Sequence, residues 1–236
     1  MTTSAPQRIL VILAHPDDPE FFCGGTVGRW TMEGKEVIYL LATRGERGAD
    51  DPQTAPQELA RIREAEQRAA AAELGVHQVV FLDHPDGSLV ASLALRRDLA
   101  REIRRWRPQI VVTCDPTVRY RPGSLNHPDH RALGDAALDA VFPDARNPLQ
   151  FPELLLQEGL EPHRVHDVYI AGAVDPDTEV DITPSFEAKL AALRHHRSQI
   201  GDFPALEERL REWHRVENAD GTVRYVERFA RIKMSR

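Results

Sequence analysis

The chain alternates short apolar runs with amphipathic segments, and polar residues follow several of the runs. Residues 9–13 form one continuous apolar run. Such a run, ended at once by polar residues and Pro16, is typical of a parallel strand buried on both faces, because a half-exposed strand would alternate. Similar runs at 37–42, 79–82 and 110–114 predict three more strands.

Helical periodicity fills the segments between these runs. It predicts helices over residues 23–34, 57–74 and 92–106, and a fourth helix that runs from 127 to about 141. Strands that alternate with helices favour a parallel sheet with right-handed crossovers. We therefore expect an α/β fold, Rossmann-like, with a mainly parallel sheet flanked by helices.

The pattern is weaker in the last third of the chain. Residues 165–174 predict another strand, and residues 185–199 and 204–216 predict helices. The tail, 222–233, alternates loosely and fits either an edge strand or a short terminal helix. The chain has 236 residues and shows no repeat or linker, so we expect a single domain over 1–236.

Composition excludes several classes of protein. A net charge of -7 provides no basic field, so no nucleic-acid partner is expected. No apolar run has the length of a membrane span or the form of a signal peptide, so we expect neither membrane insertion nor secretion. Cys23 and Cys114 lack CxxC spacing, which points to small core residues in a cytoplasmic protein.

A cluster of polar residues, Ala14-His15-Pro16-Asp17-Asp18, follows the first strand. Ligands of open α/β sheets bind beyond the carboxyl ends of the strands. One imidazole and one carboxylate can bind a metal here and leave a second carboxylate free as a base. The alternative is a simple turn in which Asp18 caps the next helix.

A second cluster, His127-Pro128-Asp129-His130, follows the fourth strand. Its two histidines are three positions apart at the start of a helix, so they share a face. With His15 and Asp18, His130 would give two histidines and one carboxylate, as in catalytic zinc hydrolases. The alternative is a helix cap with surface histidines.

Together the two clusters resemble the PIG-L/LmbE-like family of zinc-dependent N-deacetylases. The similarity covers nearly the whole chain. It extends through Gly24-Gly25-Thr26, Thr43-Arg44-Gly45-Glu46, Arg63 with Glu66, Pro85-Asp86-Gly87, and residues 193–199.

The resemblance implies a zinc ion and a general base. Zinc would be bound by His15, Asp18 and His130, and Asp17 would be the base that activates water. The expected activity is removal of an N-acyl group, most simply acetyl, from an amino sugar or a sugar conjugate. The resemblance also implies a homo-oligomer, a trimer or hexamer.

The resemblance assigns four further residues. His127 would stabilise the oxyanion, with Asp129 orienting it, and Arg63 and Asp86 would hold sugar hydroxyls. The alternatives are that Arg63 is an ordinary surface arginine and that Asp86 only shapes a turn.

Two other functions fit parts of the sequence. One is an amidase that cleaves a thiol-sugar conjugate or another amide at the same site. The other is a non-catalytic α/β module that binds a sugar or nucleotide at the Gly24-Gly25 turn. The first strand is not followed by GxGxxG, which argues against dinucleotide binding.

The chain departs from the family pattern in two places. Pro19 separates the first cluster from Glu20, which leaves the role of Glu20 open, and Tyr120 lies seven residues before His127, too far for the mobile tyrosine of some relatives. Three histidines are expected to be structural or to lie at the rim of the site: His84, His195 and His196. Of these, His196 is the best candidate for a rim contact.

Overall fold

The structure, a computed structural model, describes residues 6–234; the predicted domain, 1–236, extends beyond that range at both ends. Its centre is a mixed sheet with the strand order β3-β2-β1-β4-β7-β10-β8. The predicted α/β class and mainly parallel sheet are confirmed. The parallel strands are β3 (Gln78–Phe81), β2 (Glu36–Leu41), β1 (Arg8–Leu13), β4 (Ile110–Cys114) and β7 (Asp167–Ala171).

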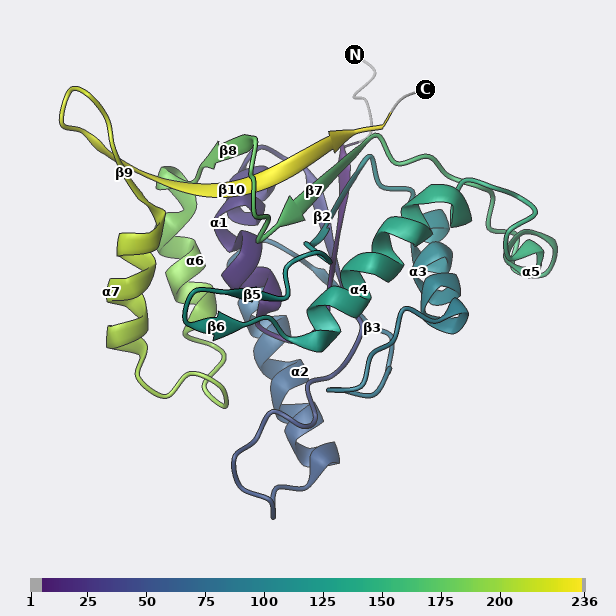
Figure 1. Cartoon of the computed structure of the whole chain (residues 1–236), viewed down its shortest axis with the longest axis horizontal. Helices are drawn as coiled ribbons and strands as arrows, with labels where there is room; N and C mark the ends of the chain where they lie inside the picture. Colours follow the sequence, from purple (N-terminus) through teal and green to yellow (C-terminus); the bar gives the residue numbers. More distant parts are fainter. Residues whose placement is uncertain (1–5, 235–236) are drawn as a thin grey trace.

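Helices cover both faces of the sheet. One face is packed against α1 (Asp18–Met32), α2 (Pro56–Glu73) and α6 (Phe186–Leu193). The opposite face is packed against α3 (Leu93–Trp106), α4 (Pro128–Asp139), which continues into a π-helical turn, and α5 (Pro152–Leu156). The last helix, α7 (Phe203–His214), packs on α6 (Figure 1).

Strand β1 explains the first apolar run. Ile9, Val11 and Leu13 enter the core on the side of α1 and α2, whereas Leu10 and Ile12 enter the core on the side of α3 and α4. All five side chains have no exposed surface. Burial of each contributes roughly 1.5–3 kcal/mol, so a strand covered on both faces needs an apolar residue at every position.

The C-terminal tail was predicted less well. It forms β10 (Val223–Lys233), which is neither an edge strand nor a helix but lies antiparallel between β7 and β8 (Thr178–Asp181). The residues that pair with β10 belong to β7 and β8, within 167–181. Pairing with residues so distant in the sequence produces no recognisable pattern in the tail itself. The helix predicted over 185–199 ends at Leu193, and the helix predicted from residue 23 begins at Asp18.

Four short strands were not predicted: β8, described above, and three others. The Arg- and Gly-containing loop before the second cluster holds a hairpin of β5 (Tyr120–Arg121) and β6 (Ser124–Leu125), and β9 (Arg215–Glu217) pairs with the start of β10. Cys23 and Cys114 are buried and unpaired, as expected of core residues. Among the helices of residues 6–234, none combines the length and apolar character that crossing a membrane requires.

A buried ion pair stabilises a bend in α1. Cys23 has non-helical backbone angles (φ -150°, ψ 17°), so the next turn loses helical acceptors for its N–H groups. The Glu227 carboxylate of β10 accepts from the N–H of Gly25 (3.0 Å) and Thr26 (2.7 Å), and Lys189 Nζ lies 2.6 Å from it. Burial opposes the charge on Glu227, but Lys189 lowers its pKa below the usual value.

We expect Glu227→Ala to lower the free energy of unfolding by about 3–5 kcal/mol, because it leaves the Lys189 charge buried without a partner. Urea denaturation at pH 7 measures the change. The exposed Glu208 is the matched control, and Glu208→Ala should stay within about 0.5 kcal/mol of wild type. Equal stability of the two variants would contradict this account.

The same pair predicts a pH dependence. Because the folded protein lowers the pKa of Glu227, the stabilisation is present above the unfolded value of about 4.3 and is lost as the pH falls through the folded value. The stability difference between wild type and Glu227→Ala should therefore shrink on acidification below about pH 4. Urea titrations from pH 7 to pH 3 test this expectation.

Candidate metal centre and catalytic pocket

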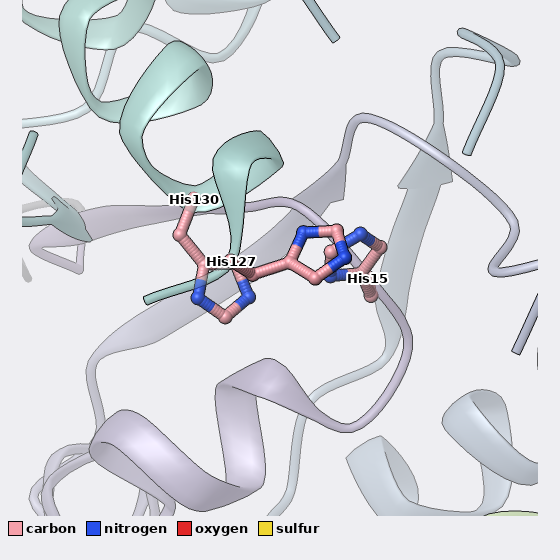
Figure 2. A group of neighbouring side chains, drawn as sticks. All are labelled: His15, His127 and His130. Atoms are coloured by element: carbon pink, nitrogen blue, oxygen red, sulfur yellow. The ribbon is translucent and has the colours of Figure 1, made fainter. Parts of the chain in front are cut away.

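The fold brings the two polar clusters together at one edge of the sheet. Strands β1 and β4 are paired neighbours, so the residues that follow them meet. The rings of His15, His127 and His130 converge, with His15 after β1 and the other two at the start of α4 (Figure 2). Their centroids lie 4.8 Å (His15–His127), 5.3 Å (His15–His130) and 5.4 Å (His127–His130) apart.

Two distances within the predicted ligand set are close to the spacing of ligand atoms around a tetrahedral metal, although each involves a different oxygen of Asp18. Asp18 Oδ1 lies 3.1 Å from His130 Nε2, and Asp18 Oδ2 lies 3.3 Å from His15 Nδ1. Ligand atoms around a tetrahedral zinc with bonds of 2.0–2.1 Å are about 3.3 Å apart. Asp18 also accepts the backbone N–H of His15 at 2.9 Å. The alternative in which Asp18 caps the helix is therefore wrong.

Two other donor groups meet at the same place. One nitrogen each of His15, His127 and His130 lies within 4.8 Å of the others, and so do single atoms of His15, Asp86 and Asp129. His15 belongs to both groups. Within residues 6–234, both groups found at this edge of the sheet therefore include His15.

Two carboxylates lie behind His15 and orient its ring. His15 Nε2 is 3.1 Å from Asp86 Oδ1 and 3.3 Å from Asp129 Oδ2. If the proton is on Nε2, as these acceptors require, Nδ1 keeps its lone pair for a metal. Burial lowers the pKa of His15, but hydrogen bonds to Asp129, Asp18 and Asp86 raise it to about 12 in the metal-free protein.

The contacts of Asp129 differ from those predicted. Its carboxylate accepts from the N–H groups of Gly87 (2.7 Å) and Leu89 (3.0 Å) and contacts His15, whereas only its backbone N–H reaches His127, donating to Nδ1 at 3.2 Å. The proton of a neutral His127 must then be on Nε2. Burial lowers the pKa of His127, which favours this neutral form.

Asp17 lies on a strained turn between the predicted ligands His15 and Asp18. Its φ is 93°, a left-handed conformation that costs a non-glycine residue about 1–3 kcal/mol. The Asp17 N–H donates to Gln67 Oε1 (2.8 Å), and Arg63 Nη2 donates to Pro16 O (2.7 Å) and Asp17 Oδ2 (3.2 Å). The turn is thus held from α2.

A buried cluster supports Gln67 in turn. Gln67 Nε2 lies 3.0 Å from both carboxylate oxygens of Glu20, and His196 Nε2 lies 3.0 Å from Glu20 Oε2. His196 is only 1% exposed, so the prediction that it lies at the rim of the site is wrong. Glu20, whose role the sequence left open, anchors the residue that holds Asp17.

The environment of Asp17 suits a base near neutral pH. Burial and the neighbouring Asp18 charge raise its pKa, Arg63 lowers it, and the result is about 7. A general base is most effective when its pKa lies near the working pH. Asp17 faces a pocket of about 340 Å³ lined by six of the predicted residues: His15, Asp17, Arg63, Asp86, His127 and His130.

Arg63 and Asp86 line this pocket but also have contacts within the protein. Arg63 is 4% exposed, so the alternative of a surface arginine is wrong, and its Nη1 donates to Gly45 O at 3.0 Å. Asp86 Oδ2 accepts the N–H of Arg47 at 2.9 Å. Burial raises the pKa of Asp86, but His15 and this N–H lower it to about 2.

Several supporting residues were missed at the sequence level. Gln67 is one, and Asn126, whose Oδ1 lies 3.2 Å from His130 Nδ1, is another. Both side chains are neutral amides, and their spacing in the sequence is not distinctive. One signal was available for Gln67: it lies four positions after Arg63 and therefore on the same face of the helix. His84 is structural as expected, since its Nε2 lies 3.1 Å from Asp98 Oδ2.

Comparison with known proteins identifies the family. Residues 10–141 match the family described as PIG-L: GlcNAc-PI de-N-acetylase. The chain belongs to this family. Both clusters of this PIG-L family protein lie within the matched residues.

Named relatives of this PIG-L family protein are sugar deacetylases. Diacetylchitobiose deacetylase of Thermococcus kodakarensis is 37% identical over 195 residues, covering 82% of this chain and 70% of the relative. The 1D-myo-inositol 2-acetamido-2-deoxy-alpha-D-glucopyranoside deacetylase of Actinosynnema mirum is 30% identical over 240 residues. This match covers 85% of this chain and 83% of the relative.

Solved structures share the fold. N,N'-diacetylchitobiose deacetylase from Pyrococcus horikoshii superposes with a TM-score of 0.85 at 32% identity, covering 96% of this chain and 84% of the other. GalB, a hydratase from Pseudomonas putida, superposes with a TM-score of 0.72 at 20% identity, covering 97% of this chain and 99% of the other. That likeness concerns the fold alone, so the function must be argued from the site.

We expect Asp18→Ala and His130→Ala to lose bound metal, because each removes one of three ligands whose spacing fits the ion. Metal content per chain, measured by mass spectrometry after purification, should be about one in wild type and near zero in both variants. His84→Ala is the control and should keep its metal. Full occupancy in His130→Ala would contradict the ligand set.

Proposed function

We propose that this protein is a zinc-dependent deacetylase that removes the acetyl group from the amino group of an N-acetylglucosamine-type sugar. The proposal is supported by the convergence of His15, His127 and His130 in one pocket with Asp17, which Gln67 and Arg63 hold in place. The relatives named above act on a disaccharide and on an inositol glycoside. Their shared part is the acetamido sugar, which is the part we assign to the catalytic pocket.

His15, Asp18 and His130 would hold the metal. Two imidazoles and one carboxylate are a ligand set of catalytic zinc sites, which keep a further position open. Bound there, zinc supplies a Lewis acid that polarises the acetamide carbonyl and lowers the pKa of water toward about 7. The carboxylates of Asp86 and Asp129 keep the His15 ring in the tautomer that binding requires.

Asp17 is the proton carrier of this mechanism. As a carboxylate it accepts the proton of the attacking water, and as an acid it returns a proton to the departing amine of the sugar. Arg63 holds Oδ2 and thereby fixes the carboxyl group, which leaves Oδ1 for the proton. In the protein without metal, burial and the Asp18 charge raise the pKa of Asp17 to about 7.

His127 stabilises the charge that develops on the acetamide oxygen. Its Nδ1 accepts the Asp129 N–H, so Nε2 carries the hydrogen that can be donated. Removing one donor of this kind typically costs about 2.7–4 kcal/mol of transition-state stabilisation. In this proposal Asp129 orients His127 through its backbone and His15 through its side chain.

Arg63 and Asp86 are proposed to contact sugar hydroxyls from the wall of the pocket. Because both side chains also have contacts within the protein, replacing them does not test contact with sugar hydroxyls alone. Because Arg63 also holds Asp17, its removal should slow hydrolysis of sugars and of simple acetamides alike. The predicted cytoplasmic location and the trimer or hexamer stay predictions.

Asp17→Asn should lower kcat by about 10²-fold or more, because the amide cannot accept the proton, while metal content stays at the wild-type level. Acetate release from N-acetylglucosamine and diacetylchitobiose measures kcat. The exposed Asp50 provides the control variant, Asp50→Asn, with normal turnover. A normal kcat in Asp17→Asn would remove Asp17 from the mechanism.

Gln67→Leu should lower kcat roughly tenfold, because the strained Asp17 turn loses its N–H acceptor. Metal content should be unchanged, because Gln67 is not one of the predicted metal ligands. Gln57→Leu on the exposed first turn of the same helix is the control. If Gln67→Leu changed only the melting temperature, Gln67 would have no positioning role.

A further inference from the structure

Asn126 contacts a predicted metal ligand, and the mechanism above does not use it. It lies between the end of β6 and the start of α4, directly before the second cluster (Figure 1). Its Oδ1 lies 3.2 Å from His130 Nδ1. The other ring nitrogen, Nε2, lies 3.1 Å from Asp18 Oδ1. His130 therefore has an oxygen acceptor at each of its two ring nitrogens.

The amide of Asn126 has one orientation that satisfies its neighbours. Its Nδ2 donates to the carbonyl oxygen of Val118 at 2.8 Å. If the amide were turned over, Oδ1 would face that carbonyl, and two acceptors would meet without a hydrogen between them. Oδ1 therefore faces His130, where it can only accept. This hydrogen bond forms only when His130 carries a hydrogen on Nδ1.

The β5–β6 hairpin holds Asn126 in this position. The Asn126 N–H donates to the carbonyl of Arg119, which precedes the hairpin, at 2.9 Å. From α4, Arg131 Nη1 donates to Asn126 O at 2.8 Å. Arg121 of the hairpin donates to two carbonyls that follow β7. The backbone of Asn126 is thus fixed from both sides.

The two acceptors compete for the hydrogen of His130, because a neutral imidazole carries only one. Asp18 is a carboxylate, and hydrogen bonds to a charged group are stronger than those to a neutral amide, so Asp18 alone would favour the hydrogen on Nε2. A histidine that binds a metal through Nε2 must keep that nitrogen free of hydrogen. Asn126 stabilises the form in which Nε2 has its lone pair available.

His15 meets the same requirement with its opposite nitrogen. Asp86 and Asp129 lie at its Nε2, so the lone pair of Nδ1 is on the side of Asp18. Two carboxylates thus hold the His15 ring, whereas one neutral amide holds the His130 ring. The tautomer of His130 is therefore the one that a single substitution can change.

We propose that Asn126 is a positioning residue that sets the metal affinity of the site by holding His130 in the form with a hydrogen on Nδ1. The inference rests on the ligand set of the proposed function and adds to it a residue outside the predicted ligands. Loss of a hydrogen-bond partner of this kind weakens metal binding about 10–100-fold.

The test separates the two hydrogen bonds of the Asn126 side chain. Asn126→Leu removes both the acceptor for His130 and the donor for Val118, whereas Asn126→Asp removes only the donor. The Kd of zinc, measured by competition with a chromophoric chelator, should rise roughly 10–100-fold in Asn126→Leu. In Asn126→Asp it should be no more than about threefold above wild type. Leu125→Ala, at a side chain 87% exposed on the same hairpin, is the matched control and should leave the Kd unchanged.

The melting temperature of the metal-free protein reports the structural part of the effect. It should fall by a similar amount in both Asn126 variants, because both lose the hydrogen bond to Val118. A structural role alone would weaken zinc binding equally in the two variants, so equal Kd values above wild type would overturn the inference. A Kd within about twofold of wild type in Asn126→Leu would overturn it too.

Zinc binding is measured without substrate, which separates this inference from the proposed function. If the Kd values follow the expected order but wild type releases no acetate from N-acetylglucosamine or diacetylchitobiose, the proposed function fails and the role of Asn126 stands. If acetate is released and the Kd of zinc is the same in every variant, the role of Asn126 fails and the proposed function stands.

Discussion

One hydrogen bond, from the Asp17 N–H to Gln67 Oε1, holds the turn on which the site depends. The chain must reverse between His15 and Asp18 so that both face one point, and it does so by placing Asp17 at φ 93°. A non-glycine residue keeps such a conformation only when its surroundings enforce it. Here Arg63 and Gln67 enforce it from α2, and the buried Glu20 and His196 hold Gln67.

The sequence predicted what depends on local pattern. The apolar run of β1 and the alternation of strands with helices identified the parallel half of the sheet, because each strand there carries its own pattern of burial. In the structure, the pairing of β1 with β4 brings His15 close to His130. The resemblance to a family supplied the roles of these residues, which spacing alone left open.

The sequence could not predict what depends on distant partners. The tail, 222–233, fitted two structures because the residues of β7 and β8 that pair with β10 are more than 40 positions away in the sequence. His196 looked like a rim residue because its partner, Glu20, is 176 positions distant. Asp129 was expected to face His127, its near neighbour in sequence, yet its carboxylate reaches His15, Gly87 and Leu89.

The position of β10 has a consequence for the order of folding. Among the strands of residues 6–234, β8 pairs with β10 alone, and the bend of α1 is capped by Glu227 of β10. During synthesis both elements leave the ribosome long before residues 223–233 do. The N–H groups of Gly25 and Thr26 find their acceptor, Glu227, about 200 residues further along the chain. Contacts between residues so distant in sequence form slowly. The nascent chain should remain dependent on protection from aggregation until its last strand is made.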